Sequence, residues 1–224
     1  MNPPMELNEY LDHTLLKSTA SEGEIIALCN EAITNNFFSV CVNSCHVPIA
    51  KQILQETNIN ICTVVGFPLG AMSTAAKVCE AKQAIADGAT EIDMVMNIGY
   101  LKSRNYVAVL KDIAEVKEAI GNRTLKVILE ISELSKNEIV KACEICLDAK
   151  ADFIKTSTGF SKSGATLTAV KIIKKTIKGK AKIKASGGIR DYSTALKYIE
   201  AGVQRIGASA GVTMVKKQTS EVTY

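Results

Sequence analysis

Short runs of β-branched and other apolar residues recur along the whole chain and alternate with longer, more polar stretches. Runs of four or five such residues, bounded by turn-forming residues, are typical of buried β-strands. Their centres lie about 23 to 34 residues apart, which is the length of one strand–helix unit. The pattern predicts eight strands, at residues 11–14, 39–42, 62–65, 92–96, 126–130, 153–156, 182–185 and 205–208.

Between the predicted strands, apolar residues fall at the spacing of one face of an α-helix. Residues 104–120 illustrate this, because Val107, Leu110 and Ile113 share one face. Several of these stretches end in a glycine that can cap a helix before the next strand, as Gly88 does. Seven helices are predicted in this way, at residues 22–35, 47–56, 73–87, 104–120, 135–149, 166–177 and 192–201.

Eight strand–helix units without a linker predict an α/β fold, a single (β/α)8 TIM barrel. The barrel domain is expected to span residues 1–224, with a flexible C-terminal tail from about residue 216, where the apolar period ends. The alternative is an open, doubly wound sheet. That fold has fewer strands and usually a glycine-rich fingerprint after the first one, and neither GxGxxG nor GxxxxGK[ST] occurs here.

Composition and charge exclude several classes of protein. The chain is 47% hydrophobic and 22% charged, which excludes a wholly disordered chain. The net charge is +4, yet there are four Arg and no Trp, so no nucleic-acid partner is expected. The lysine-rich stretch 171–184 is interpreted as a solvated helix face and loop in preference to a polyanion-binding patch.

The sequence also indicates a cytoplasmic protein without a membrane partner. No apolar run approaches the roughly 18 residues that cross a bilayer. The N-terminus carries Glu6, Glu9 and Asp12 where a signal peptide would place basic and then apolar residues. Seven cysteines, an odd number, are expected to be reduced thiols, and the CxxC of Cys143 and Cys146 lies within a predicted helix.

Charged residues within the predicted strands point to chemistry inside the barrel. Side chains alternate between the two faces of a strand, so Asp93 faces away from Ile92 and Met94. The same parity directs Lys155 and Lys184 into the lumen. These three residues could form an ion-pair cluster that only closes the barrel. Two lysines with one carboxylate leave an excess of positive charge, which favours a chemical role.

A buried lysine next to a second ammonium group is suited to Schiff-base chemistry. Burial and a neighbouring positive charge both favour the neutral amine, which is the form that attacks a carbonyl. Lys155 or Lys184 would attack while the other keeps the positive charge. Asp93 would carry protons during the carbinolamine and enamine steps.

The strand ends carry motifs that resemble the deoxyribose-phosphate aldolase family, in register from about residue 11 to 215. The resemblance implies a cofactor-free class I aldolase (a carbon–carbon lyase) on a (β/α)8 barrel. Such an enzyme reversibly cleaves 2-deoxy-D-ribose 5-phosphate into acetaldehyde and D-glyceraldehyde 3-phosphate, in deoxynucleoside catabolism, and uses no metal. The most specific segments are Lys-Thr-Ser-Thr-Gly at 155–159 and Lys-Ala-Ser-Gly-Gly-Ile-Arg at 184–190; the others are 11–17, 40–43, 65–70 and 91–97.

The resemblance assigns roles to the three lumen residues. The family's Schiff-base lysine falls on Lys155, its proton-relay aspartate on Asp93 and its second lysine on Lys184. Asp12 matches a polar residue of the family's pocket, although anchoring a loop is an equal alternative. Cys41 matches a cysteine near the substrate and is expected to be a packed thiol instead of a nucleophile.

The substrate phosphate is expected across the last loops, where backbone amides and a short helix after Gly211 would face it. This chain has Ser209-Ala210 where many relatives have two serines, and Phe160 where some have Lys, with Lys162 two residues on. The cationic partner of the phosphate, with Arg190 as one candidate, therefore stays open. The residues expected at the substrate and phosphate are Asp12, Cys41, Thr158, Gly159, Gly187, Gly188 and Ser209.

Two alternatives remain at this point: a non-catalytic sugar-phosphate-binding barrel, and a sugar-phosphate isomerase. An isomerase would need a Glu base, such as Glu130, and a neutral histidine, for which His13 and His46 are the candidates. A homodimer is expected from the size of the barrel. Tyr224 ends the polar tail, for which a disordered end without a role is preferred; the alternative is that its phenol relays a proton if the tail reaches the barrel mouth.

Overall fold

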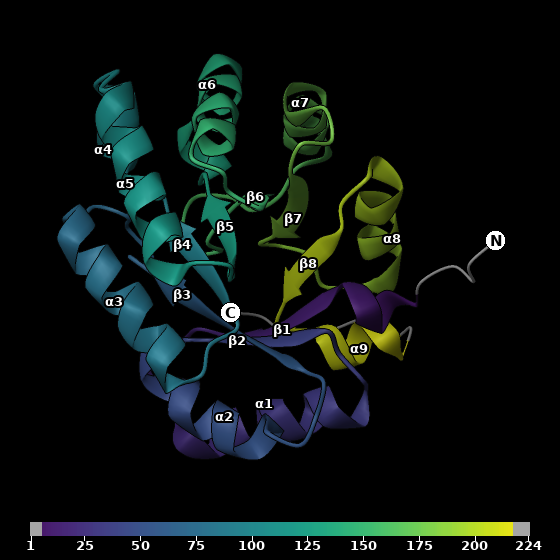
Figure 1. Cartoon of the computed structure of the whole chain (residues 1–224). Coiled ribbons are helices and arrows are strands. Elements are labelled where there is room, and N and C mark those ends of the chain that lie inside the picture. The colour runs from purple at the N-terminus through teal and green to yellow at the C-terminus, as the bar shows by residue number, and fades with distance from the viewer. Residues whose placement is uncertain (1–5, 217–224) are drawn as a thin grey trace.

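A computed structural model describes residues 6–216 of the chain. Eight parallel strands close into a barrel, in which each strand pairs with the next one along the chain and β8 pairs with β1 (Figure 1). The predicted (β/α)8 TIM barrel is therefore confirmed. The strands are β1 (Leu11–Leu15), β2 (Ser39–Val42), β3 (Asn60–Val65), β4 (Glu91–Val95), β5 (Thr124–Ile128), β6 (Phe153–Lys155), β7 (Lys182–Ser186) and β8 (Arg205–Ala208).

Helices surround the strands on the outside (Figure 1). Side-chain caps fix where several of them begin. Ser21 and Ser135 each form a capping box with the glutamate three residues further on, which satisfies two exposed backbone N–H groups. The helices are α1 (Glu22–Thr34), α2 (Val47–Leu54), α3 (Thr74–Asp87), α4 (Ile98–Lys102), α5 (Tyr106–Ile120), α6 (Lys136–Asp148), α7 (Leu167–Ile177), α8 (Tyr192–Ala201) and α9 (Gly211–Val215), with 3-10 turns at Leu7–Tyr10, Ser44–His46 and Ile131–Glu133.

Two of the predicted elements differ from the structure for local reasons that can be identified. The helix predicted at 104–120 begins at Tyr106, because Arg104 adopts a left-handed φ of 55° and Asn105 caps α5; the separate α4 precedes it. The strand predicted at 126–130 starts two residues earlier and ends at Ile128. Glu130 cannot continue it, because its φ is 55°.

The apolar core lies between the strands and the helices, and the lumen of the barrel is polar. Ile92, Met94 and Met96 are fully buried in the outer core, as the alternation of side chains predicts. The strand register then brings the lumen residues together: Asp93 lies beside Lys126, and Lys155 lies beside Lys184. The alternation of side chains along each strand therefore places apolar residues in the outer core and polar residues in the lumen.

The loops after the strands meet closely at the carboxyl end of the barrel. Gly164 and Gly187, from the β6–α7 and β7–α8 loops, pass so close that a Cβ on Gly187 would lie 2.8 Å from the Gly164 Cα. Glycine at these two positions lets the loops touch through backbone alone. Within residues 6–216, none of the helices has both the length and the apolar character needed to cross a bilayer.

Candidate active site

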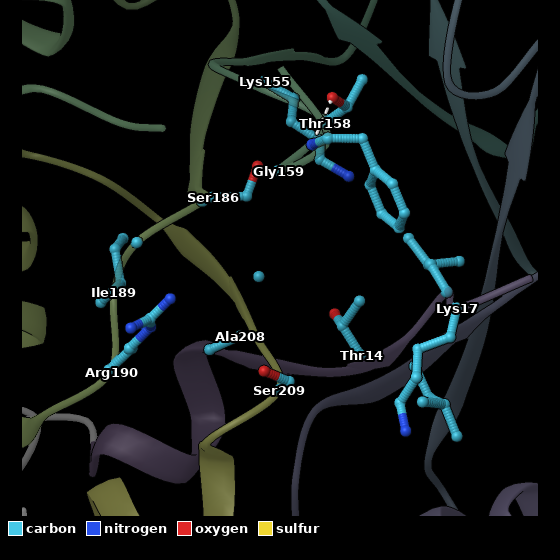
Figure 2. Close-up of a pocket in the computed structure, with 16 residues that line it drawn as sticks. Thr14, Lys17, Lys155, Thr158, Gly159, Ser186, Ile189, Arg190, Ala208 and Ser209 are labelled. Carbon is cyan, nitrogen blue, oxygen red and sulfur yellow. Dashed lines mark hydrogen bonds between the residues drawn. The ribbon is translucent and has the colours of Figure 1, made fainter. Parts of the chain in front are cut away.

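A cavity of about 340 Å³ opens at the carboxyl end of the barrel, where TIM-barrel enzymes have their active sites. Loops that follow β1, β6, β7 and β8 form its wall. Figure 2 shows Lys155 and Thr158 at one side of this space, with Arg190 and Ser209 at the opposite side. The lining residues are Thr14, Leu15, Leu16, Lys17, Lys155, Thr158, Gly159, Phe160, Ser186, Gly187, Gly188, Ile189, Arg190, Gly207, Ala208 and Ser209.

Beneath the cavity, the carboxylate of Asp93 accepts hydrogen bonds from three lysines. Its Oδ2 accepts hydrogen bonds from the Nζ atoms of Lys155 at 2.8 Å and Lys184 at 2.6 Å. Its Oδ1 accepts one from the Nζ of Lys126 at 2.9 Å. The first two lysines and Asp93 are the three lumen residues that the sequence predicts, and the structure brings them together.

A second part of the cluster was not predicted from the sequence. Arg205 donates from Nε to Asp12 Oδ1 at 2.7 Å and from Nη2 to Glu91 Oε2 at 2.8 Å. Glu91 also pairs with Lys126 at 2.6 Å, and Asp12 forms an ion pair with Lys184. The missed residues are Lys126, Glu91 and Arg205; the last two begin their strands, and Lys126 lies in the middle of β5. Their strand parity would have identified them, since Glu91 precedes Asp93 by two residues.

The buried cluster contains four cations and three carboxylates among the described residues. Burial favours a neutral Asp93, but the ammonium groups of Lys126, Lys155 and Lys184 outweigh it and hold the pKa of this carboxyl well below its usual range. For Lys184, burial likewise opposes the charge, but Asp12 and Asp93 hold the pKa of the ammonium well above its usual value. One positive charge is in excess, as predicted, although the cluster is larger than predicted.

Lys155 differs from the other two lysines on Asp93 in its access to solvent. It lines the cavity, whereas Lys126 and Lys184 are fully buried and do not. Its place at the end of β6 explains this, because the strand stops at Lys155 and the chain turns into a loop. Among these three amines, a ligand in the cavity therefore meets Lys155 first.

Asp12 and Cys41 lie below the cavity instead of lining it. Asp12 is fully buried and binds Lys184, Arg205 and the hydroxyl of Ser39, which donates to Oδ1 at 2.6 Å. Its carboxylate is therefore part of the buried cluster. Cys41 packs against Leu16, Cys62 and Val64, as expected of a packed thiol.

The glycines expected around a phosphate line one end of the cavity. Gly159, Gly187 and Gly188 all have left-handed backbone conformations, with φ of 87°, 88° and 79°. These conformations turn the loop backbone toward the cavity without a Cβ. Ser209 lines the same cavity, on the loop after β8.

Thr158 is held by a residue that the sequence did not assign to this loop. Its hydroxyl forms a very short hydrogen bond to Glu130 Oε2 and accepts one from the Phe160 N–H at 3.0 Å. The Thr158 N–H donates to the same carboxylate at 3.2 Å. Glu130 is buried, so its carboxylate fixes the turn that presents Gly159 to the cavity.

The cationic residues near the expected phosphate divide into two groups. Lys162 does not line the cavity and pairs with Glu133 at 3.0 Å on the surface. Arg190 and Lys17 do line the cavity. Phe160 packs edge-on against Phe67, with ring centroids 5.2 Å apart, so it forms apolar wall where some family members have lysine. Tyr224 lies outside the described residues.

Neither a metal site nor an isomerase site fits the geometry well. The ligand atoms of Cys41, Cys62 and Asp93 lie within 4.8 Å of one another, but both oxygens of Asp93 already hold ammonium groups. The histidines do not line the cavity, and His13 bonds Glu31 at 2.6 Å. Glu130, the candidate isomerase base, does not line the cavity and accepts hydrogen bonds from Thr158 through Oε2.

Comparison with known proteins gives consistent matches over nearly the whole chain. Residues 8–218 match the model of the DeoC/LacD family aldolases. A Mesoplasma florum protein named deoxyribose-phosphate aldolase 1 is 52% identical over 98% of this chain and 100% of its own length. A solved structure described as "QR15, an Aldolase" has a TM-score of 0.92 at 43% identity and covers 95% of each chain. A deoxyribose phosphate aldolase from Aeropyrum pernix has a TM-score of 0.86 at 28% identity, over 94% of this chain and 89% of the other.

Proposed function

The chain belongs to the DeoC/LacD family of aldolases, and we propose that it acts through a class I centre in which Lys155 forms a Schiff base with the substrate. Its reaction is the reversible cleavage of 2-deoxy-D-ribose 5-phosphate into acetaldehyde and D-glyceraldehyde 3-phosphate. One observation carries the assignment of the nucleophile: of the three lysines bound to Asp93, Lys155 is the one that lines the cavity.

Schiff-base formation requires the neutral amine of Lys155, and the cluster around it carries one positive charge in excess. With four cations and three carboxylates, the cluster becomes balanced when one proton leaves. Lys184 keeps its proton, because Asp12 and Asp93 raise the pKa of this ammonium despite burial. The neutral Lys155 amine can then attack the C1 aldehyde of the open-chain sugar, and loss of water from the carbinolamine gives the iminium.

Asp93 Oδ2 is the shared acceptor between the two lysines, at 2.8 Å from one Nζ and 2.6 Å from the other. A proton can pass between Lys155 and Lys184 across this single oxygen, which suits carbinolamine formation and dehydration. Cleavage of the C2–C3 bond then takes the proton from the C3 hydroxyl and leaves an enamine on Lys155. Protonation of the enamine at C2 and hydrolysis release acetaldehyde.

At the other end of the substrate, we assign the phosphate to the loops after β7 and β8. Gly187 and Gly188 present backbone to the cavity, and Ser209 supplies a hydroxyl from the neighbouring loop. Arg190 lines the same cavity and brings the positive charge that complements a phosphate. Thr158 and Gly159 complete the wall between the phosphate end and Lys155.

A steady-state assay tests this assignment. The wild-type protein should form acetaldehyde from 2-deoxy-D-ribose 5-phosphate, and Lys155→Ala should not, because the covalent intermediate cannot form. Lys162→Ala is the matched control, since that lysine follows the same strand but pairs with Glu133 outside the cavity. A Lys155→Ala protein that keeps wild-type turnover would overturn the proposal, as would an isomerised sugar phosphate as the product.

We also propose that the protein is a cytoplasmic homodimer in which residues 1–224 form one barrel domain. The size of the barrel supports the dimer, and the seven free cysteines support the cytoplasm. The A. pernix relative is described as a tetramer, so a larger assembly is the principal alternative. Light scattering during gel filtration decides between them: twice the chain mass supports the dimer, and one or four times the chain mass contradicts it.

A further inference from the structure

Two thiols lie side by side in the lumen, beneath the cavity. Cys41 on β2 and Cys62 on β3 are direct partners in the register of these neighbouring parallel strands. Both are completely buried, and their sulfurs lie within 4.8 Å of each other. Neighbouring strands are about 4.7–4.9 Å apart, which falls within the Cα separation of about 4.4–6.8 Å that a disulfide spans.

The thiol pair is bonded directly to the lysine–carboxylate cluster. Cys62 Sγ donates to Asp93 Oδ1 at 3.1 Å and accepts from Lys126 Nζ at 3.4 Å. Asp93 Oδ1 therefore has two donors, Lys126 and Cys62, while Oδ2 serves Lys155 and Lys184. A chemical change at Cys62 therefore acts directly on Asp93, the carboxylate to which proton transfer in the aldolase reaction is assigned.

The surroundings make the two thiols unequal. The neighbouring Cys62 thiol, opposed by burial and supported by the Lys184 and Lys155 ammonium groups, lowers the pKa of Cys41 below its usual value. Burial raises the pKa of Cys62. The pair therefore combines one thiol that ionises readily with one that keeps its proton, which is the arrangement of an attacking and a resolving cysteine.

We propose that Cys41 and Cys62 form an oxidisable dithiol site for hydrogen peroxide, and that their disulfide reversibly inactivates the enzyme. The proposal rests on the proposed function, because Asp93 is where oxidation would act. The oxidant is small enough to enter through the cavity. Leu16 lines the cavity and belongs to the same small apolar cluster as both cysteines, so the thiols lie close beneath the cavity wall.

The chemistry balances in two steps. The Cys41 thiolate attacks one oxygen of the peroxide, the O–O bond breaks, and the departing hydroxide takes up the proton that Cys41 released, which gives a sulfenic acid and water. The Cys62 sulfur then attacks the sulfenic sulfur, the S–O bond breaks, and the hydroxyl leaves as water with the Cys62 proton. Overall, two thiols and one hydrogen peroxide give one disulfide and two water molecules.

Oxidation removes the donor that Cys62 offers to Asp93 and ties β2 to β3 inside the lumen. Both changes alter the field around Lys155 and Lys184, so turnover should fall about 10²-fold or more. Reduction restores both thiols, and activity should return with them.

The other cysteines provide internal controls. Cys143 and Cys146 are also a buried pair, but they lie on one helix, and burial raises the pKa of both thiols. Cys45 and Cys79 are exposed and lie outside the lumen. Peroxide should therefore cross-link the lumen pair in preference to the helical pair, although both pairs are equally hidden from bulk solvent.

The experiment treats the reduced full-length enzyme with hydrogen peroxide and follows activity and non-reducing peptide mass spectrometry together. We expect a cross-linked peptide pair containing Cys41 and Cys62 to appear at the rate at which activity is lost, and dithiothreitol to reverse both. The Cys62→Ala protein should show no peroxide inactivation that dithiothreitol reverses, whatever its starting activity. Cys79→Ser, which changes an exposed thiol, should keep the reversible inactivation.

Three outcomes would overturn the proposal: inactivation without the cross-link, a cross-link that leaves activity intact, or inactivation that dithiothreitol does not reverse. The cross-link is detected without any assay of turnover. A protein that forms it but never cleaves deoxyribose phosphate would therefore disprove the function and leave the dithiol site standing.

Discussion

At the scale of single residues, the three lysines bound to Asp93 differ in how many carboxylates each one pairs with. Lys126 pairs with Oδ1 and with Glu91, so two carboxylates hold its charge. Lys184 pairs with Oδ2 and Asp12 in the same way. Lys155 has Asp93 alone as its carboxylate partner among the described ion pairs, and it also faces the cavity. This difference supports the proposed role of Lys155 as the nucleophile, because it has the fewest carboxylate partners of the three lysines.

Replacing Lys184 tests whether its charge keeps Lys155 reactive. Lys184→Met removes an ammonium that repels a proton on Lys155, so the acidic limb of the pH–rate profile should move to higher pH. Turnover should fall about 10² to 10⁴-fold, because a proton donor at Asp93 Oδ2 is lost as well. The measurement is kcat against pH for both proteins. A variant that is slower but keeps the wild-type acidic limb would show that Lys184 acts only as a proton donor.

Asp93 should also contribute to stability, with a defined dependence on pH. Its pKa lies well below the unfolded value of about 3.9, so its contribution is complete above that pH and is lost as the pH falls toward the folded pKa. Asp93→Asn leaves three buried ammonium groups without their shared carboxylate and should cost about 3–5 kcal/mol at neutral pH.

Urea unfolding between about pH 3 and 7 measures both effects. The stability of the wild-type protein should drop steeply as the pH falls below about 4, and the Asp93→Asn protein should show a shallower drop. Asp152→Asn is the matched control, because that carboxylate pairs with Lys117 near the surface. Equal slopes for wild type and Asp93→Asn would contradict the assignment of the acid-sensitive charge.

The residue scale also shows what the sequence alone can and cannot predict. Alternation along the strands identified Asp93, Lys155 and Lys184, because each lies inside a run that is otherwise apolar. Lys126 and Arg205 were missed, since a charge at the start of a predicted strand is normally solvated. Here the closed barrel buries those positions, and this depends on contacts among strands that are far apart in sequence.

At the scale of elements, the positions of helices and strands were predictable and their exact ends were not. The strand and helix periods are local properties, and so the eight units emerged from the sequence. The break between α4 and α5 depends on the left-handed Arg104 and the cap at Asn105. The end of β5 depends on Glu130, whose conformation is held by Thr158 from another loop. Neither feature changes the hydrophobic pattern.

The contact between the β6–α7 and β7–α8 loops gives a prediction at this scale. Gly187→Ala would place a Cβ 2.8 Å from the Gly164 Cα and would strain a backbone with φ of 88°. The two loops would then move apart at the phosphate end of the cavity, so KM for 2-deoxy-D-ribose 5-phosphate should rise about tenfold or more with a smaller change in kcat.

Gly179→Ala is the matched control for this loop contact. Gly179 has a similar φ of 77°, but no atom lies within 4 Å of its Cβ position. It should therefore lose stability through backbone strain alone and keep the wild-type KM. An unchanged KM in the Gly187→Ala protein would show that the contact between the loops does not shape the phosphate end of the cavity.

At the scale of the whole molecule, the apolar core lies between the strands and the surrounding helices, and charged side chains fill the lumen of the barrel. Ion pairs buried in this way add little to stability compared with apolar packing, since desolvation offsets much of their attraction. The outer core between strands and helices supports the fold, and the lumen is then available for chemistry. The polar lumen thus follows from the reaction more than from the needs of folding.

Covalent trapping of acetaldehyde tests directly whether Lys155 is the lysine that forms the Schiff base. The protein is incubated with acetaldehyde and sodium borohydride, and its peptides are mapped by mass spectrometry. We expect one N-ethyl adduct on Lys155 in the wild-type protein and none at this site in Lys155→Ala, while Lys126 and Lys184 remain unmodified. An adduct at full yield on Lys184, or one that survives in Lys155→Ala, would contradict the assignment of Lys155 as the nucleophile.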